Sequence, residues 1–346
     1  MTGVFFILSG EHPTLPKAET EAILAAEGAP YRILGEGTQL LRLDINPAAA
    51  EKVIERSAYT HLCCREIFRY PAESLTEILT AAQRLDFEGF LRPKESFMVR
   101  VKRIRNSSTH INTATLERKL GAVIYKQIVG SWVNFEKPRR TFLGFLVDDE
   151  LIFGLKLREA EVKKFYFRTP RKKPFFHPSS LQPKLARCMV NLSKAHKSQV
   201  IYDPFCGTGT VMIEAALMGF ETLGSDLLKK MIKGAKLNLN YFKVKGHHLI
   251  IADALKTPIH HIDSIVTDPP YGRSATTRGL TTASIIEGLL SKTADLLSED
   301  GAVCIAAPKT VDIKTIGEKL GFTVRDIHQI RIHRSLTREI AVLTKR

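Results

Sequence analysis

The chain has 346 residues, 44% of them hydrophobic and 25% charged, which suffices for two or three domains with their own cores and excludes wholesale disorder. No apolar run approaches the ~20 residues that cross a bilayer, and the run at residues 4–8 is too short for a signal-peptide core. The five cysteines form no CxxC pair and have no zinc-binding spacing with histidine, so we expect a reduced, cytoplasmic protein without a metal.

The net charge is +15, and it is unevenly distributed along the chain. Residues 1–90 carry a net charge of −5, residues 91–200 carry +16, and residues 201–346 carry +4. A local excess of positive charge is typical of proteins that bind a polyanion. The alternative is a lysine-rich surface that keeps the protein soluble. An anionic membrane fits less well, because the basic segment has no long amphipathic helix.

Residues 1–70 alternate between strand and helix patterns. In chain order we expect a strand, a helix, a hairpin, a second helix and an extended segment, at residues 4–8, 17–27, 31–34 with 40–45, 48–56 and 62–70. This βαββαβ order predicts a ferredoxin-like domain. The segment contains no catalytic constellation, so we interpret it as a platform.

Residues 71–157 are predicted to form a second α+β unit. Its expected elements are a helix, a strand, a second helix and a hairpin, at residues 74–84, 96–104, 113–128 and 141–147 with 151–157. The strand and the turn after it carry four basic residues: Arg100, Lys102, Arg103 and Arg105. We expect these side chains to contact phosphates and 2′-hydroxyls of RNA. The alternative is an exposed basic edge that prevents aggregation of strands.

Residues 158–180 contain several prolines and no sustained periodicity, which indicates a linker, and its Lys172 and Lys173 extend the expected RNA-binding surface. From residue 181 to 346, short β-branched runs alternate with helical segments. This alternation predicts an α/β domain with a mostly parallel, doubly wound sheet. The last two strands, at 323–330 and 340–344, follow one another without a helix, so we expect them to pair antiparallel at one edge.

The segment Asp203–Thr210 closes the first strand of this domain and opens a helix. Gly207 and Gly209 allow the backbone to approach a ligand, and the start of the helix offers free amide donors. A dinucleotide-binding fingerprint requires a third glycine where Met212 stands, so NAD is disfavoured. The position after the first strand still places a ligand at the topological switch point of the sheet.

Acidic residues also end the next two strands. Asp226 can accept hydrogen bonds from both ribose hydroxyls of an adenosine, and capping of a helix is an equal alternative. Asp253, which precedes Ala254, can accept one from an adenine amino group. Together with Asp203, they place carboxylates at the ends of three consecutive strands, which structure alone explains poorly.

The fourth strand ends in Asp268-Pro269-Pro270-Tyr271-Gly272. The prolines hold an extended turn and leave the Pro269 carbonyl without a ladder partner. Hydrogen bonds from the amino group of a base to Asp268 and to this carbonyl would direct the nitrogen lone pair toward an electrophile, while Tyr271 offers a stacking plane. Asp268 can also take the released proton, before or after methyl transfer. The structural alternative is a Pro-Pro turn with a capping aspartate.

The segments 203–209 and 268–271 together resemble those of class I S-adenosylmethionine-dependent amino-methyltransferases. The segment Pro174-Phe175-Phe176-His177-Pro178, before the helix at 181–192, resembles the motif that covers the methionine end of that cofactor. The basic middle unit resembles a THUMP domain. In this order, and with the run 271–274, the whole chain resembles the archaeal tRNA guanosine-10 N2-methyltransferase family.

The resemblance implies that S-adenosylmethionine is the cofactor and S-adenosylhomocysteine the product. It implies a set of cofactor-lining residues: Asp203, Phe205, Gly207, Thr208 and Gly209. It places the ribose at Asp226, the adenine at Asp253 and Ala254, and the methionine moiety near His177, for which packing between prolines is a nearly equal alternative. It makes Asp268, Pro269, Pro270 and Tyr271 catalytic. It brings Arg273, Ser274 and Arg278 to a nucleotide extruded from the tRNA stem, with an ordinary surface loop as the equal alternative.

We therefore expect a monomeric, cytoplasmic tRNA guanine-N2 methyltransferase that yields N2-methylguanosine, N2,N2-dimethylguanosine or both. The eukaryotic relatives work with a small activator subunit, and the sequence leaves open whether this chain needs such a partner. Three alternatives stay open: a different guanosine at tRNA position 6 or in ribosomal RNA, a DNA amino-methyltransferase with the same Asp-Pro-Pro-Tyr motif, and a non-catalytic RNA-binding protein with a relic cofactor fold. The front half of the chain argues against the DNA enzyme.

Overall fold

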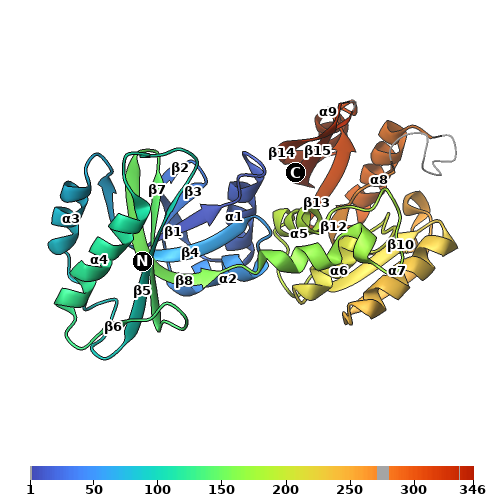
Figure 1. Ribbon diagram of the computed structural model, residues 1–346. Coiled ribbons are helices and arrows are strands. Elements are labelled where there is room, and N and C mark those ends of the chain that lie inside the picture. Colours follow the sequence, from blue (N-terminus) through green and yellow to red (C-terminus); the bar gives the residue numbers. More distant parts are fainter. Residues whose placement is uncertain (1, 271–279, 335) are drawn as a thin grey trace. The chain divides into compact units, whose positions relative to one another are not determined.

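A computed structural model of the chain describes residues 2–270, 280–334 and 336–346 (Figure 1). Its contacts define two compact units that interleave along the sequence. The first unit consists of residues 1–10, 29–55 and 60–160, and the second of residues 11–28, 56–59 and 161–346. This grouping follows contacts, whereas the domain boundaries expected after residues 70, 157 and 180 follow chain order and stay a prediction.

The first unit is built on one eight-stranded sheet with the order β2-β3-β1-β4-β8-β7-β5-β6. Its strands are β1 (Thr2–Leu8), β2 (Tyr31–Gly37), β3 (Leu40–Ile45), β4 (Thr60–Pro71), β5 (Ser96–Arg103), β6 (Trp132–Val133), β7 (Arg140–Val147) and β8 (Glu150–Glu159). The helices in this part of the chain are α2 (Pro47–Arg56), α3 (Leu75–Gln83) and α4 (Thr113–Gln127). Strand β4 pairs with β1 on one side and β8 on the other, so the two expected front domains share one sheet.

The pairing within this sheet confirms the expected α+β patterns. Strands β1 to β4 are antiparallel in the order of a ferredoxin-like βαββαβ unit, and β5 lies parallel to both β6 and β7. The β7–β8 hairpin turns at Asp148 and Asp149, whose φ angles of +49° and +58° suit a two-residue hairpin turn. Phe142 and Phe153 stack with ring centroids 6.0 Å apart in the core that α3 and α4 share with the sheet.

The second unit contains a seven-stranded sheet with the order β11-β10-β9-β12-β13-β15-β14. Its strands are β9 (Val200–Asp203), β10 (Glu221–Asp226), β11 (His247–Ile251), β12 (Ile262–Thr267), β13 (Leu297–Pro308), β14 (Phe322–His333) and β15 (Leu336–Lys345). Its helices are α1 (Leu15–Ala26), α5 (Pro183–Leu192), α6 (Thr210–Leu217), α7 (Lys229–Tyr241), α8 (Thr282–Leu296) and α9 (Ile313–Lys319). Strands β9 to β13 pair in parallel, and β15 runs antiparallel to both β13 and β14, which confirms the expected doubly wound sheet with an antiparallel edge.

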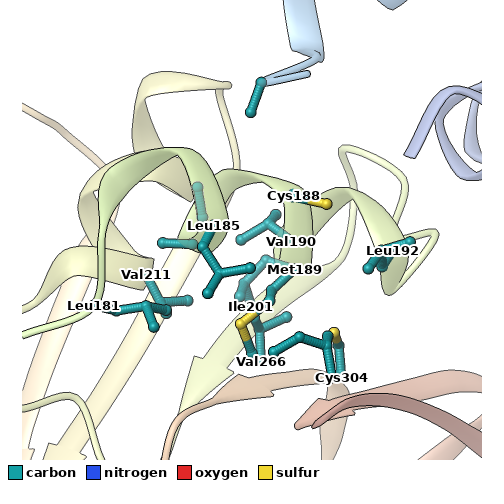
Figure 2. Packing of buried hydrophobic residues seen from close by; sticks show 14 of the residues in the cluster. Leu181, Leu185, Cys188, Met189, Val190, Leu192, Ile201, Val211, Val266 and Cys304 are labelled. Atoms are coloured by element: carbon teal, nitrogen blue, oxygen red, sulfur yellow. The ribbon is translucent and has the colours of Figure 1, made fainter. Parts of the chain in front are cut away.

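Helix α5 lies at the centre of the largest core cluster of this unit (Figure 2). Its apolar side chains, among them Leu185 and Met189, share the cluster with Ile201 of β9 and Val266 of β12. Figure 2 shows Leu185, Met189, Ile201 and Val266 between the helix and the strands below it. The cluster therefore fixes the two strands that border the switch point of the sheet.

Helix α1 belongs by contact to the second unit, although the sequence pattern places it in the ferredoxin-like segment. Leu15 and Ala22 share the core cluster of α5. Glu19 is fully buried and accepts hydrogen bonds from Ser57 Oγ (2.6 Å) and from Asn191 Nδ2 of α5 (2.8 Å). Burial raises the pKa of Glu19, and these donors partly oppose the rise. An early helix is thus anchored by a residue that follows almost the whole first unit in sequence.

The segment expected to be a linker is packed rather than extended. It forms two 3-10 turns, Val162–Arg168 and Pro170–Lys172. Arg168 donates two hydrogen bonds to the buried carboxylate of Glu214 on α6, at 2.6 and 3.1 Å, and Arg187 of α5 donates a third at 2.9 Å. Two guanidiniums on one carboxylate hold this segment against α5 and α6.

Within the described part of the chain, no helix is long and apolar enough to cross a membrane. All five cysteines are buried thiols outside any disulfide. Burial raises the pKa of Cys63 to about 12 and that of Cys188 well above its usual range, so these thiols stay protonated at neutral pH.

Candidate active site

The carboxyl ends of four adjacent strands carry acidic residues. Asp203 ends β9, Asp226 ends β10, Asp253 follows β11 and Asp268 follows β12, and these strands are neighbours in the order β11-β10-β9-β12. Because the four strands are parallel, the acids lie in a row at one edge of the sheet. The structure thus brings together the four carboxylates that the sequence singled out.

A pocket opens at this edge where β9 and β12 adjoin. Five of the predicted cofactor residues line it, together with the predicted catalytic acid: His177, Asp203, Phe205, Gly207, Thr208 and Asp268. The sequence reasoning missed several further lining residues, among them Ser179, Ser180, Leu181 and Met231. In the described chain, the lining does not include Gly209, Asp226, Asp253 or Ala254.

Asp203 occupies the buried end of the pocket. Its Oδ1 accepts hydrogen bonds from Thr267 Oγ1 (2.7 Å) and from the Phe205 amide (3.2 Å). Burial raises the pKa of Asp203 to about 7, and the neighbouring charge of Asp268 adds to the rise while the hydrogen bonds oppose it. At neutral pH this group is therefore poised between its acid and its carboxylate form.

The loop between β9 and α6 turns sharply around two glycines. Gly207 and Gly209 have φ angles of +50° and +77°, which other residues adopt only with strain. Gly209 is the N-cap of α6, so the turn delivers the backbone to the pocket at the amide end of the helix. Met212, which replaces the third glycine of a dinucleotide fingerprint, is fully buried in a core cluster.

Asp226 uses both carboxylate oxygens to hold the turns around it. Its Oδ2 accepts from the Gly207 amide (3.1 Å) and its Oδ1 from the Leu228 amide (2.9 Å). Burial raises the pKa of this group, while the two amides oppose the rise. Each oxygen retains a second lone pair with which it can accept from a hydroxyl. Asp253 likewise caps the 3-10 turn Ala254–Lys256 through the Leu255 amide (3.0 Å), and Ala254 is buried.

The Pro-Phe-Phe-His-Pro segment is held over the pocket by α7. Phe175 exchanges hydrogen bonds with the Asn238 side chain at 2.9 and 3.0 Å, and Asn238 also donates to the Thr208 carbonyl at 2.9 Å. The Phe175 ring packs on Gly234, where any Cβ would lie 2.0 Å from the ring. His177 is part-buried and lines the pocket, with Nδ1 2.7 Å from Ser179 Oγ. Asn238 and Gly234 gave no sequence signal, because they are ordinary residues within a helix.

Lys173 lies inside the second unit rather than on a surface. It is 5% exposed, and its ammonium donates to Thr210 Oγ1 at the first position of α6. Burial lowers the pKa of Lys173 to about 8. This placement favours a role in supporting the cofactor loop over the RNA contact that we predicted. Lys172 is exposed and lies over the Tyr166 ring, 5.3 Å from its centroid.

The Asp-Pro-Pro turn is described only as far as Pro270. Asp268 is largely buried and pairs with Arg338 of β15, with Nη2 and Oδ2 3.3 Å apart. Tyr271, Arg273, Ser274 and Arg278 lie outside the described residues, so their predicted roles stay predictions.

The basic residues of β5 are placed differently from one another. Lys102 and Arg105 are exposed, and Arg100 is part-buried beside Glu117 (3.3 Å) with its guanidinium 4.8 Å from the Phe135 ring centroid. Arg103 donates to two backbone carbonyls, those of Ser107 (2.5 Å) and Ile111 (2.6 Å). Arg103 therefore organises the loop after β5, whereas Lys102 and Arg105 are exposed to solvent and Arg100 is partly occupied by Glu117 and Phe135.

Exposed aromatic side chains accompany these cations, and the sequence reasoning did not consider them. Phe135, beside Arg100, is 62% exposed, and Trp132, which pairs with Ser96 on β5, is 50% exposed. Tyr166, beside Lys172, is 60% exposed, and its neighbour Phe167 is 64% exposed. Aromatic rings interleaved with cations are typical of surfaces that stack on unpaired bases. That interleaving is the sequence signal that would have found them.

Comparisons with known proteins concern the fold and the family of the chain. Residues 170–340 match the model of the RMKL-like methyltransferase domain family, and residues 72–156 match that of the THUMP domain. A tRNA (guanine(10)-N2)-dimethyltransferase of Methanothermobacter thermautotrophicus is 36% identical over 98% of both chains. One of Pyrococcus abyssi is 34% identical over 79% of this chain and 81% of its own. The crystal structure of TrmN from Thermus thermophilus shares the fold, with a TM-score of 0.54, 20% identity, and coverage of 99% of this chain and 100% of that one.

Proposed function

Because the chain belongs to the tRNA (guanine(10)-N2)-dimethyltransferase family, we propose that it methylates the exocyclic N2 of guanosine 10 in tRNA with S-adenosylmethionine as the methyl donor. One observation carries the proposal: Asp268, at the start of an Asp-Pro-Pro turn, lines the same pocket as the glycine turn at Gly207. That pairing places an acceptor for an amino group beside a cofactor loop.

The residues around the pocket fit S-adenosylmethionine. The left-handed turn at Gly207 and Gly209 exposes backbone where a side chain would otherwise project, and Asp226 retains lone pairs for two hydroxyls. His177 and Asp203 would hold the methionine end, Asp226 the ribose, and Asp253 with Ala254 the adenine. When bound, the cofactor supplies an electrophilic methyl group on a sulfonium that departs as a neutral thioether.

The contribution of the chain to the chemistry is to align and polarise the target nitrogen. The lone pair of a guanine amino group is delocalised into the ring, so the nitrogen is a poor nucleophile. Acceptance of its N–H bonds by the Asp268 carboxylate and the Pro269 carbonyl turns the lone pair toward the methyl group. Alignment of this kind supplies a large share of the rate in two-reactant transfers. Tyr271 stacks on the base in this proposal.

The substrate is gripped by the exposed cations and aromatic rings. Lys102, Arg105 and Arg100 contact phosphates, and Trp132 and Phe135 stack on unpaired bases. Lys172 and Tyr166 form an equivalent pair in the second unit. Because guanosine 10 is paired in the tRNA stem, the base is extruded before transfer.

Nucleoside mass analysis of tRNA transcripts treated with the enzyme and S-adenosylmethionine tests the proposed function. We expect N2-methyl- or N2,N2-dimethylguanosine in a transcript with guanosine at position 10 and none after its replacement by adenosine. Replacement of guanosine 6 is the matched control. If only the guanosine 6 replacement abolishes the product, the methylated site is position 6 of tRNA. If only ribosomal RNA is methylated, the substrate is ribosomal RNA.

Failure of the chain to bind S-adenosylmethionine in calorimetry would favour a non-catalytic RNA-binding protein. The same assay addresses the remaining expectations. We propose that the protein is a cytoplasmic monomer, whose activity a small activator subunit enhances. The activity of the purified chain, with and without a candidate activator, tests the need for that subunit. Its mass in solution, measured by light scattering, tests whether it is a monomer.

A further inference from the structure

Arg338 lies on β15, outside every cofactor motif, yet it contacts the acid at the centre of the proposed site. Its Nη2 is 3.3 Å from Asp268 Oδ2, and the two side chains are only 12% and 13% exposed. We propose that Arg338 is a positioning residue for methyl transfer, which holds Asp268 ionised and oriented to accept a hydrogen bond from the target amino group. This inference rests on the proposed function.

The register of the sheet brings the two residues together. Thr267 at the end of β12 lies opposite Ile305 of β13, which lies opposite Ala341 of β15. Arg338, opposite Pro308, is therefore three residues nearer the carboxyl edge than Ala341. Two strand spacings, or roughly 10 Å, separate β15 from β12, so only a long side chain from this position reaches Asp268.

Both side chains also leave the sheet on the same face. Strand residues alternate between faces, so Arg338 shares its face with Ile340 and Val342. These two residues belong to the same buried cluster as Val266, which precedes Asp268 by two positions. The pair is thus a product of the fold rather than of a mobile surface loop.

The site needs a cation at this position. Asp203 and Asp268 line one pocket, and two neighbouring carboxylates disfavour ionisation of one another. A guanidinium remains protonated at any physiological pH and opposes that effect. Ionisation matters because a carboxylate only accepts hydrogen bonds, whereas a protonated acid would donate one to the target nitrogen.

The ion pair also orders the proton transfer. During methylation the N2 lone pair forms the N–C bond while the C–S bond breaks, and the electron pair of that bond stays on sulfur. N2 is then cationic and releases one proton to Asp268. The ion pair orients Asp268 to receive that proton, which leaves after the N–C bond forms because a neutral amino group is a far weaker acid than the cationic N2.

Steady-state kinetics of R338M and R338K test the inference, with R325M as a matched control. Arg325 lies in the neighbouring strand and donates to Thr344 Oγ1, far from the Asp-Pro-Pro turn in register. For R338M we expect kcat to fall roughly 10²-fold, with little change in KM for tRNA or S-adenosylmethionine. R338K should recover part of kcat, and R325M should match the wild type.

A double-mutant cycle with D268N separates positioning from simple packing. If Arg338 acts through Asp268, D268N/R338M will be no slower than D268N alone. The inference would be overturned if the reductions in kcat of the two single mutants multiplied in the double mutant. An unchanged kcat in R338M, or an effect confined to KM for tRNA, would also overturn it. Should R338M fail to fold by circular dichroism, R338Q and R338K carry the same comparison. Failure of all three to fold would assign Arg338 to strand packing. An inactive wild type would instead refute the proposed function.

Discussion

The two units of the molecule place their charges in opposite ways. The first exposes cations such as Lys102 and Arg105 along one strand and the turn after it, where each contact with a polyanion is weak and several add up. The second buries acidic side chains such as Asp203 and Asp268 at the ends of parallel strands, where each has specific polar partners: Thr267 and the Phe205 amide for Asp203, and Arg338 for Asp268. The contrast indicates that loss of one surface cation should cost little, whereas loss of one buried carboxylate should cost nearly all activity.

The largest effect is expected from Asp268→Ala. Removal of the acceptor should lower kcat by about 10³-fold, because the amino lone pair is no longer directed at the methyl group. Affinity for S-adenosylmethionine and for tRNA should stay within a few-fold, as measured by calorimetry and filter binding. Asp295→Ala, which removes an exposed acid of α8, is the control and should be silent. Near-normal turnover of the Asp268 variant would end the catalytic assignment.

A smaller effect is expected from charge reversal on the first unit. The K102E/R105E variant should bind tRNA about tenfold more weakly, and the slope of log affinity against log salt should shrink by roughly 0.7–0.9 per lost contact. Turnover of saturating tRNA should change little. Arg103 is left intact because its reversal would also disturb the loop after β5.

Arg32→Glu is the matched control for these charge reversals, because it reverses one highly exposed charge on β2 instead of β5. An equal loss of tRNA affinity per charge in this variant would show that total charge, rather than its position on β5, determines binding.

The smallest effect concerns stability. The pKa of Asp203 is raised to about 7 from 3.8, so the folded state binds more protons than the unfolded state between these values. Stability from this group therefore falls as the pH rises from about 4 to about 7, and the deficit persists above that range. Urea unfolding at pH 5 and pH 8 measures the free energy of unfolding of both proteins. The difference, Asp203→Asn minus wild type, should be larger at pH 8 than at pH 5. A constant difference between the two proteins would contradict the assigned pKa.

Local patterns were sufficient to predict the row of strand-end acids, because each follows a short β-branched run and parallel strands end at one edge. The absence of a helix between the last two strands predicted the antiparallel edge of the sheet, and the resemblance of the motifs to known segments indicated the family of the chain. Periodicity predicted helix α1 but not its packing partner, because Leu15 and Ala22 pack on a helix about 170 residues later. Nothing local distinguishes that partner from the strands next to α1 in sequence.

The distribution of charge along the chain predicted a polyanion partner, but it did not predict which individual basic residues are exposed. Lys172 and Lys173 are adjacent in one basic run, yet one is exposed and the other is buried against Thr210. Arg338 stands in a strand of mixed composition, and only the register across three strands relates it to Asp268. Such pairings depend on long-range geometry, which single-sequence patterns do not encode.

The interleaving of the two units has a consequence for synthesis of the chain on the ribosome. The backbone passes between the units five times, and α1 is made long before α5. Glu19 can receive its hydrogen bond from Asn191 only after some 170 further residues have emerged. The first unit can complete its sheet before α1 has its packing partner. The catalytic unit can finish folding only after its last strands have been synthesised. A truncated chain that begins at residue 161 would lack α1, and part of the core cluster around α5 would then be exposed to solvent.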